Sequence, residues 1–239
     1  MKAKVHAQES ARLSALRAYN VLDTPTEKAY DDLTALAAFI CNVPIALISL
    51  IEADRQWFKS KVGISASETP RDVSFCAHAI LEKGIMVIED ARRDERFADN
   101  PLVTCTPDIR FYAGIPLLTP EGYPLGTLCV IDQQPNNLSR AQITALEALA
   151  RQVVALLELS RVSAQLAGAL EKIDSMGGLI PICAHCKGVR DDEGYWATVE
   201  EFIAQHSDVA FTHSVCDRCM QAHYPEAVKL WQATHPAPG

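Results

Sequence analysis

The sequence predicts an α+β fold in which an antiparallel sheet has helices before and after it in the chain. Residues 45–51 and 56–62 are apolar or alternating runs on either side of a polar turn, a pattern typical of a β-hairpin. Apolar residues recur at helical spacing ahead of this hairpin, in residues 9–41, and again in residues 139–175. Because the strands are joined locally, we expect an antiparallel sheet rather than a doubly wound parallel one.

The remaining elements of this domain follow the same signals. Two helices precede the hairpin, at residues 9–19 and 26–41, with turn residues at Asp23, Thr24 and Pro25 between them. After the hairpin we expect, in order, a short helix at 74–81, a strand at 86–89, a long loop at 90–109, a strand at 111–118, a turn at Gly122 and a last strand at 125–131.

The helix predicted for residues 139–175 has two parts. Its first part can pack on the sheet through apolar residues such as Leu146 and Val153. Its second part has an alternating three- and four-residue spacing of apolar side chains, which predicts a short coiled-coil seam and a homodimer. The seam consists of Leu159, Val162, Leu166, Ala169 and Ile173. The alternative is a single helix packed on its own chain; in either case Gly177 and Gly178 end it.

Charge and hydropathy exclude some classes of partner. The 30 acidic residues outnumber the 22 basic ones, for a net charge of -8, so no general positive field attracts nucleic acid or anionic lipid. The longest apolar run, Val43 to Ile51, is far shorter than the roughly 20 residues of a membrane helix. No secretory signal is visible at the N-terminus. We therefore expect a cytoplasmic protein whose thiols stay reduced.

The eight cysteines are then metal ligands, reactive thiols or core residues. Cys183 and Cys186 form one pair with a two-residue gap, and Cys216 and Cys219 form another 29 residues later. Two such pairs supply the four thiolates of a tetrahedral zinc site, with Zn–S distances of about 2.3 Å. Since all four positions are filled by protein, we predict one structural zinc ion per chain.

Other interpretations of these cysteines stay open. They could be buried without a metal, His185 or His213 could replace a thiolate, and four thiolates also suit iron. Between the pairs, we expect a helical face that runs from Trp196 to Ile203 and gives the module a small apolar core. A segment this short needs a metal ion to fold stably.

Four stretches of the chain resemble the GAF family of small-molecule sensor domains: residues 18–63, 68–81, 90–103 and 109–132. They look like a bacterial subgroup found at the N-terminus of signalling proteins, and the C-terminal module is similar to Cys-pair tails of some bacterial sensor proteins. Together with the helix spacing and the cysteine pairs, the resemblance predicts three parts, namely a GAF domain over residues 1–159, a linker helix over 160–177 and a zinc module over 178–239. The bilin, cyclic-nucleotide and methionine sulfoxide reductase subgroups have local motifs that this chain does not match.

In this family the ligand usually lies on one face of the sheet, beneath the loop that corresponds to residues 90–110. The resemblance therefore implies a pocket for an unknown ligand. Candidate contacts by side-chain chemistry are Trp57, Phe75, Cys76, His78, Asp90, Arg110, Tyr112 and Asp132. Each has a structural alternative: the aromatic residues can be core residues, Arg110 can pair with Asp90 or Asp108, and Cys76 and His78 point to different sides of a helix.

Three classes of function suit a GAF-like domain that is followed by a cysteine-pair module. The favoured one is a sensor whose GAF domain detects a small ligand or redox state and relays it through the helix to a zinc module that binds a signalling protein. An enzyme is disfavoured because no phosphoacceptor histidine occurs between His78 and His185, and no kinase or diguanylate cyclase domain follows. A thiol-dependent reductase using Cys76, Cys105 or Cys129 is the alternative. A nucleic-acid-binding ribbon is excluded because the module is acidic.

Overall fold

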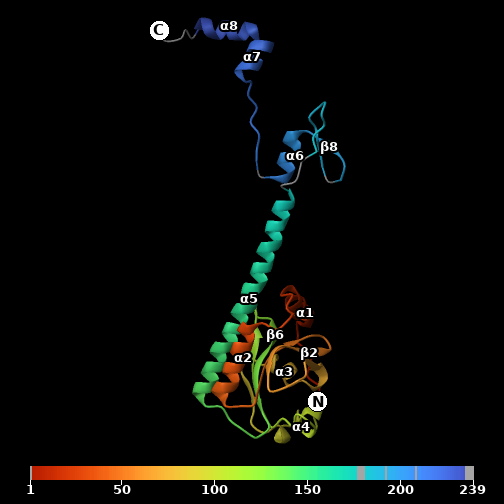
Figure 1. Cartoon of the computed structure of the whole chain (residues 1–239), viewed down its shortest axis with the longest axis vertical. Coiled ribbons are helices and arrows are strands. Elements are labelled where there is room, and N and C mark those ends of the chain that lie inside the picture. Colours follow the sequence, from red (N-terminus) through yellow and green to blue (C-terminus); the bar gives the residue numbers. More distant parts are fainter. Residues whose placement is uncertain (1, 177–180, 192, 208, 235–239) are drawn as a thin grey trace. The chain divides into compact units, whose positions relative to one another are not determined.

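The chain is divided by its contacts into two units. The computed structural model describes residues 2–176, 181–191, 193–207 and 209–234, with side chains given except within 171–176 and 231–234. The N-terminal unit is Met1–Glu171 and the C-terminal unit is Lys172–Gly239 (Figure 1). The helix end predicted at Gly177 and Gly178, the Ile173 side chain and the Pro-rich tail at 235–239 lie outside the described residues.

The N-terminal unit is built on one six-stranded sheet with the order β3-β2-β1-β6-β5-β4, in which every neighbouring pair is antiparallel. The strands are β1 (Ile45–Ile51), β2 (Arg55–Val62), β3 (Glu68–Pro70), β4 (Met86–Ile88), β5 (Phe111–Leu118) and β6 (Pro124–Asp132). Every residue of β1 is buried, because this central strand is covered on both faces. The predicted α+β fold is confirmed.

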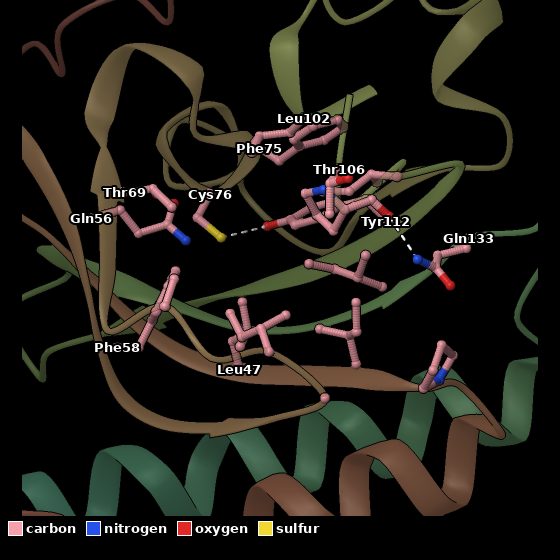
Figure 2. Close-up of a pocket in the computed structure, with 18 of the residues that line it drawn as sticks. Leu47, Gln56, Phe58, Thr69, Phe75, Cys76, Leu102, Thr106, Tyr112 and Gln133 are labelled. Atoms are coloured by element: carbon pink, nitrogen blue, oxygen red, sulfur yellow. Dashed lines mark hydrogen bonds between the residues drawn. The ribbon is translucent and has the colours of Figure 1, made fainter. Parts of the chain in front are cut away.

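Short elements and loops cover one face of the sheet, here called the loop face. They include η1 (Arg71–Val73), α3 (Phe75–Ala79), η2 (Ala91–Arg93) and α4 (Pro101–Thr104). Buried side chains of α3 pack there against those of β1, β5 and β6. Figure 2 shows this layer on the opposite side of the strands from α2 and α5. The loop face therefore combines a core with irregular chain, an arrangement that can leave room for a cavity.

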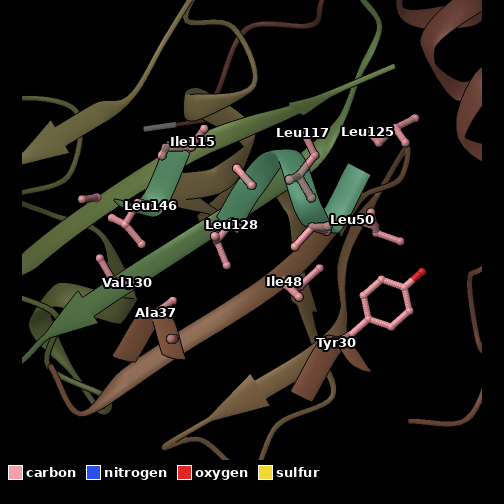
Figure 3. Packing of buried hydrophobic residues seen from close by; sticks show 14 of the residues in the cluster. Tyr30, Ala37, Ile48, Leu50, Ile115, Leu117, Leu125, Leu128, Val130 and Leu146 are labelled. Carbon is pink, nitrogen blue, oxygen red and sulfur yellow. The ribbon is translucent and has the colours of Figure 1, made fainter. Parts of the chain in front are cut away.

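Three helices cover the other face, here called the helix face. They are α1 (Glu9–Ala18), α2 (Lys28–Cys41) and the first half of α5 (Arg140–Met176). Tyr30 and Ala37 of α2, with Leu146 of α5, pack on alternate residues of the strands, such as Ile48 and Leu128 (Figure 3). The Gln142 Nε2 atom also donates to the Ile40 carbonyl at 3.0 Å, which joins α5 to α2. This face is the larger apolar core of the unit.

A β-bulge in β2 changes which face its side chains occupy. Ser60 pairs with Ile48 and Phe58 pairs with Ser49, so Lys59 has no partner on β1. The Lys59 ammonium is buried on the helix face, where it donates to Thr24 Oγ1 at 2.8 Å. The next side chain, Ser60, donates to Asp31 of α2 at 2.6 Å and so faces the same side. Phe58, before the bulge, lies on the loop face.

Several elements differ from the sequence predictions. Strand β3 was not predicted because Glu68-Thr-Pro has no apolar alternation; it forms by pairing with β2. The loop expected at 90–109 contains η2 and α4, which begin at the side-chain caps Asp90 and Asn100. The helix predicted to include Trp196 starts at Val199 instead, because Thr198 and Glu201 form a capping box.

The C-terminal unit has short elements after α5. They are β7 (Val189–Arg190), β8 (Trp196–Ala197), α6 (Val199–His206), α7 (Asp217–His223) and α8 (Pro225–Thr234). Strands β7 and β8 form a two-stranded antiparallel hairpin. Trp196 therefore sits in a strand, where its ring lies 5.8 Å from the Arg190 guanidinium.

Among the described residues, one helix is long and apolar enough to cross a membrane by length and composition. It is the Arg140–Leu170 part of α5, with a hydropathy of 1.4. A helix that packs on a protein core satisfies the same criteria. The first half of α5 has that role, since Leu146, Val153 and Leu157 are buried on the helix face. The second half exposes Leu159, Val162, Leu166 and Leu170.

Candidate functional site

A cavity of about 470 Å³ lies on the loop face of the sheet. Strands β1, β2, β5 and β6 form its floor, and α3, α4 and the loops after β2 and α4 form its walls. It is lined by Pro44, Ile45, Leu47, Gln56, Phe58, Gly63, Ile64, Ser65, Ala66, Thr69, Phe75, Cys76, Leu102, Thr106, Pro107, Ile109, Tyr112, Ile131 and Gln133. Most of these side chains are apolar, and a volume of this size is typical of sites for small organic molecules.

One end of the cavity holds a cluster of polar groups, and Thr106 and Gln133 lie toward the other end. The cluster consists of Gln56, Thr69, Cys76 and the Tyr112 hydroxyl (Figure 2). Gln56 accepts a hydrogen bond from Ser74 through its Oε1 atom. The Thr69 Oγ1 atom is buried and has no hydrogen-bond partner among the described residues. A buried hydroxyl without a partner is costly, so this atom is suited to bind a polar group of a ligand.

Helix α3 places Cys76 at this end of the cavity. The helix begins at Ser74, whose Oγ atom accepts a hydrogen bond from the Ala77 N–H at 3.0 Å. Phe75 stacks on Phe97, with ring centroids 3.9 Å apart, and this contact holds the helix over the sheet. Since Cys76 lies on the inner side of α3, its thiol faces the strands.

Tyr112 of β5 reaches Cys76 because Gly114 leaves room for it. A Cβ atom on Gly114 would lie only 2.1 Å from the Tyr112 hydroxyl oxygen. The phenol ring therefore lies along the strand, and its hydroxyl donates to the Cys76 sulfur at 3.3 Å. Burial, and secondarily the nearby thiols, raise the pKa of Tyr112, so the hydroxyl stays protonated and remains a donor.

A second thiol lies beside Cys76. The Cys129 Sγ atom of β6 is 3.6 Å from the Cys76 Sγ atom, and both residues are buried. Ser49 and Thr127, whose hydroxyl oxygens are 3.0 Å apart, lie on the same face of β1 and β6. Burial by itself raises the pKa of the Cys76 thiol. Hydrogen bonds from Cys129, Ser49, Thr127 and Tyr112 outweigh this effect and lower the pKa from an ordinary value of 9.0 to about 6. The pKa of Cys129 is raised by its bond to Cys76 and by burial.

The structure brings together three of the eight candidate ligand contacts. Phe75, Cys76 and Tyr112 line the cavity. Trp57 lies in the apolar cluster of the helix face, because it alternates with Gln56 and Phe58 along β2. His78 lies on α3 but outside the cavity lining, with its ring edge-to-face on Phe97 at 4.8 Å.

The three charged candidates lie around the cavity's neighbouring loops and do not line it. Asp90 caps η2 and binds the Arg92 guanidinium, whose hydrogen bonds lower the pKa of that carboxyl to about 2. Arg110 pairs with Asp108, as one of the two alternatives proposed, and donates to the Val103 carbonyl at 2.8 Å. Asp132 accepts from the Gln134 N–H at 3.1 Å. These residues order the loops that surround the site.

Sequence reasoning missed several lining residues, among them Gln56, Phe58 and Thr69. The alternation of β2 could have predicted Gln56 and Phe58 as lining residues, since they share the face opposite Trp57. Trp57 was predicted as a ligand contact because it is a large aromatic residue, but it lies on the face of β2 opposite the cavity. The Cys76–Cys129 contact had no local signal, because 53 positions separate the two residues.

The first cysteine pair of the C-terminal unit lies in a tight turn. The Cys186 N–H donates to the Cys183 sulfur at 3.5 Å, and the Cys183 N–H donates to the Gly188 carbonyl at 2.8 Å. Lys187 has a positive φ of 64°, which closes the turn ahead of β7. Hydrogen bonds from backbone N–H groups, that of Cys186 first, lower the pKa of the Cys183 thiol.

The second pair lies at the start of α7. Cys216 is the residue before the helix, and Cys219 is in its first turn. The Cys219 N–H lowers the pKa of the Cys216 thiol by hydrogen bonding. Each pair thus has its sulfurs close together, but among the described residues no group of three or more His, Cys, Asp or Glu side chains could hold a metal ion.

Comparison with known proteins decides the family of the N-terminal unit. The GAF domain family model matches residues 25–157, which include the whole sheet and most of the helix face. The chain belongs to the GAF family. Its GAF domain therefore contains the cavity, the Cys76–Cys129 contact and the start of α5.

A curated relative shares this GAF segment. A cyclic di-GMP phosphodiesterase of Pseudomonas aeruginosa is 43% identical over 148 residues, which cover 62% of this chain and 25% of that protein. The match thus spans about a quarter of the relative's length. This chain and that enzyme are similar over one segment of each.

Two solved structures are similar to this chain at low identity. The GAF domain of Thermosynechococcus elongatus PixJ matches with a TM-score of 0.50 and 14% identity, over 67% of this chain and 96% of that one. A domain of a sensor histidine kinase protein from Sinorhizobium meliloti matches with a TM-score of 0.47 and 21% identity, over 60% of this chain and 97% of that one. At 14% identity, the likeness to the PixJ domain concerns the fold alone.

Proposed function

We propose that this protein is a signalling sensor whose GAF domain binds a small, uncharged and largely apolar molecule in the loop-face cavity. The observation that carries the proposal is the chemistry of the wall: none of the described residues that line the cavity is Asp, Glu, Lys, Arg or His. The one lining group that ionises near neutral pH, the Cys76 thiol, would be negative and would repel anions. Burying an ionised ligand without a countercharge costs several kcal/mol. The cavity therefore favours neutral molecules over nucleotides, phosphates and charged amino acids.

The polar end of the cavity gives the ligand its orientation. The buried Thr69 hydroxyl lacks a partner among the described residues, and Gln56 and Tyr112 lie beside it. Most of the rest of the wall is apolar, with Phe58, Phe75 and several aliphatic side chains, and its other polar residues are Ser65, Thr106 and Gln133. A ligand with one hydrogen-bonding group and an apolar body satisfies both parts of the wall.

Helix α5 is the proposed route of the signal. Its first half packs on the GAF core through Leu146, Val153 and Leu157, and the same helix continues to Met176 in the C-terminal unit. Its exposed apolar residues Leu159, Val162 and Leu166 support pairing with a second copy of the chain. A dimer seam of this kind can shift between two packings when a ligand changes the GAF core.

The four-cysteine module is the proposed output. Cys183, Cys186, Cys216 and Cys219 would hold one zinc ion, which would supply structural cross-linking and no catalytic step. The residues fit such an ion in part, since each pair has its thiols close together and near backbone N–H donors. With the ion bound, the module would fold and bind a signalling protein in the cytoplasm.

The experiment that tests the ligand proposal uses two fluorescent probes of the same shape. N-phenyl-1-naphthylamine is neutral, and 1-anilinonaphthalene-8-sulfonate adds a sulfonate to a similar pair of rings. We expect the neutral probe to bind the full-length protein at least about tenfold more tightly. Ala66→Trp, at the exposed rim of the cavity, should abolish this binding.

A matched variant controls for the added tryptophan. Ala98 is exposed and does not line the cavity, so Ala98→Trp should leave probe binding unchanged. Equal affinity for the two probes, or equal loss of binding in both variants, would overturn the proposal of a neutral-ligand cavity.

A further inference from the structure

Two buried cysteines face each other on the loop face of the GAF domain, and the proposed ligand binding does not use this contact. Cys76 comes from α3 and Cys129 from β6, and their sulfurs are 3.6 Å apart. A disulfide bond is about 2.05 Å long, so the sulfurs need to approach by only about 1.5 Å. Cys41, the third buried cysteine of the domain, lies instead in the apolar cluster of the helix face.

The surroundings of the pair are polar and stabilise a thiolate. The Tyr112 hydroxyl donates to the Cys76 sulfur, and the Ser49 and Thr127 hydroxyls lie beside it. A thiol that merely fills a core has no need of such donors, and burial alone raises the pKa of Cys41 to about 11. The cluster therefore differs from an ordinary buried cysteine in its chemistry and not only in its position.

The two sulfurs differ in access. Cys76 lines the cavity, whereas Cys129 lies behind it in β6 and does not belong to the lining. A small oxidant that enters the cavity thus meets Cys76 first. Cys129 is then the neighbouring thiol that can attack an oxidised Cys76, which is the arrangement of a reactive and a resolving cysteine.

We propose that Cys76 and Cys129 form a redox site that a hydroperoxide oxidises to a reversible disulfide. The Cys76 thiolate attacks one peroxide oxygen, the O–O bond breaks, and the leaving alkoxide or hydroxide takes up a proton. This step gives a sulfenic acid at Cys76. The Cys129 sulfur then attacks the Cys76 sulfur, the S–O bond breaks, and water leaves with the thiol proton. In total, two thiols and one hydroperoxide give one disulfide, one alcohol or water, and one water.

This disulfide would change the polar end of the cavity. Cys76 would move toward β6, and the hydrogen bond from the Tyr112 hydroxyl would be lost. Since Phe75 precedes Cys76 and stacks on Phe97, the position of α3 over the cavity would change as well. The redox site adds a second signal, oxidation, to the cavity of the proposed sensor. Its role in signalling rests on that proposed function.

The test is a disulfide map of the full-length protein after treatment with hydrogen peroxide. Free thiols are alkylated under denaturing conditions, and cross-linked peptides are identified by mass spectrometry. We expect near-stoichiometric joining of Cys76 to Cys129, reversed by dithiothreitol. In Cys129→Ser, no such cross-link can form, and dimedone should label the sulfenic acid that remains at Cys76.

Control variants separate this chemistry from general thiol oxidation. Cys41→Ser removes a buried cysteine of the other face and should leave the cross-link yield unchanged. The exposed Cys105 reports the peroxide dose. If Cys76 and Cys129 remain free thiols at a dose that fully oxidises Cys105, the inference is wrong.

The same samples distinguish the two proposals. Binding of N-phenyl-1-naphthylamine without the cross-link would overturn the redox site and leave the neutral-ligand cavity standing. The cross-link without probe binding would overturn the ligand proposal alone. With both present, oxidation should weaken probe binding by about tenfold or more, because the disulfide moves α3.

Discussion

The two units of this chain are stabilised in different ways. In the GAF unit, apolar clusters fill both faces of the sheet. In the C-terminal unit, Val189 is the only buried residue among those whose side chains the structure describes. Large apolar side chains such as Trp196, Val215 and Leu230 are exposed there. The GAF unit thus has its own hydrophobic core, whereas the C-terminal unit needs a further source of stability.

The small size of the C-terminal unit limits what this further source of stability can be. A segment of this size gains too little from apolar burial to offset the conformational entropy lost on folding, unless a metal ion, disulfides or a partner contribute. Its four cysteines stand in two pairs at the ends of turns and helices, where a metal ion could join them. The scarcity of buried side chains among the described residues of the C-terminal unit therefore supports the proposed zinc ion, and removing a cysteine pair tests it.

The largest expected effect comes from removing one cysteine pair. Cys183→Ser with Cys186→Ser should abolish binding of about one zinc ion per chain, as measured by metal analysis. Because the ion would be the main source of order in this unit, amide protection across residues 181–234 should fall to that of unfolded peptide. Protection of the GAF sheet should not change.

Cys105→Ser serves as the control for cysteine loss, since Cys105 is an exposed residue of the GAF unit. It should keep the metal and the protection of both units. If the double variant retains protection in the C-terminal unit, or if the wild type binds no metal, the proposed zinc module is wrong; iron in place of zinc would correct the identity of the ion.

A smaller effect is expected at the exposed part of α5. Leu166 is 60% exposed and lies in the predicted seam, so Leu166→Asp would place a charge within a dimer interface. We expect light scattering to report a dimer for the wild type and a monomer for this variant. The GAF core should stay folded, because Leu166 lies beyond its packed residues.

Ala164→Asp adds the same charge on the opposite side of the helix and should leave the dimer intact. If Leu166→Asp has the same mass as the wild type, the predicted seam does not form the dimer interface. Wild-type protein that stays monomeric and binds phosphatidylcholine vesicles would show that the apolar stripe of α5 contacts lipid instead.

The smallest effect concerns an ion-pair network that closes the GAF unit. Glu9 of α1 accepts hydrogen bonds from Arg12 at 2.7 Å and from Arg71 of η1 at 2.6 Å. Burial by itself raises the pKa of Glu9. These hydrogen bonds outweigh this effect and lower the pKa from an ordinary value of 4.5 to about 2. Since the folded pKa is the lower one, the stabilisation is present above about pH 4.5 and is lost as the pH falls toward 2.

Glu9→Gln should therefore lower the free energy of unfolding of the GAF unit by about 2 kcal/mol at pH 7. The difference from the wild type should shrink as the pH approaches 2, as measured by urea unfolding. Glu95→Gln changes an exposed carboxylate and should have little effect at either pH. A pH-independent difference would contradict the titration of Glu9 as its cause.

The sequence predicted the parts of the fold that depend on local patterns. Apolar or alternating runs identified β1, β2, β5 and β6, and helical spacing identified α1, α2 and α5. Strand β3 was missed because its pairing, and not its composition, makes it a strand. The cavity wall was predicted only in part, because Trp57 and Gln56 are neighbours on opposite faces. The Cys76–Cys129 pair depends on the folded packing of α3 on β6, which no local pattern contains.

The bulge at Lys59 divides β2 into two segments that natural variation or design can change separately. Before it, Gln56 and Phe58 face the cavity; at and after it, Lys59 and Ser60 hold the start of α2. Substitutions in the first segment can alter which molecule is recognised without loosening the helical layer. The extra residue at the bulge thus allows the side chains that line the cavity to change without a change in the packing of α2.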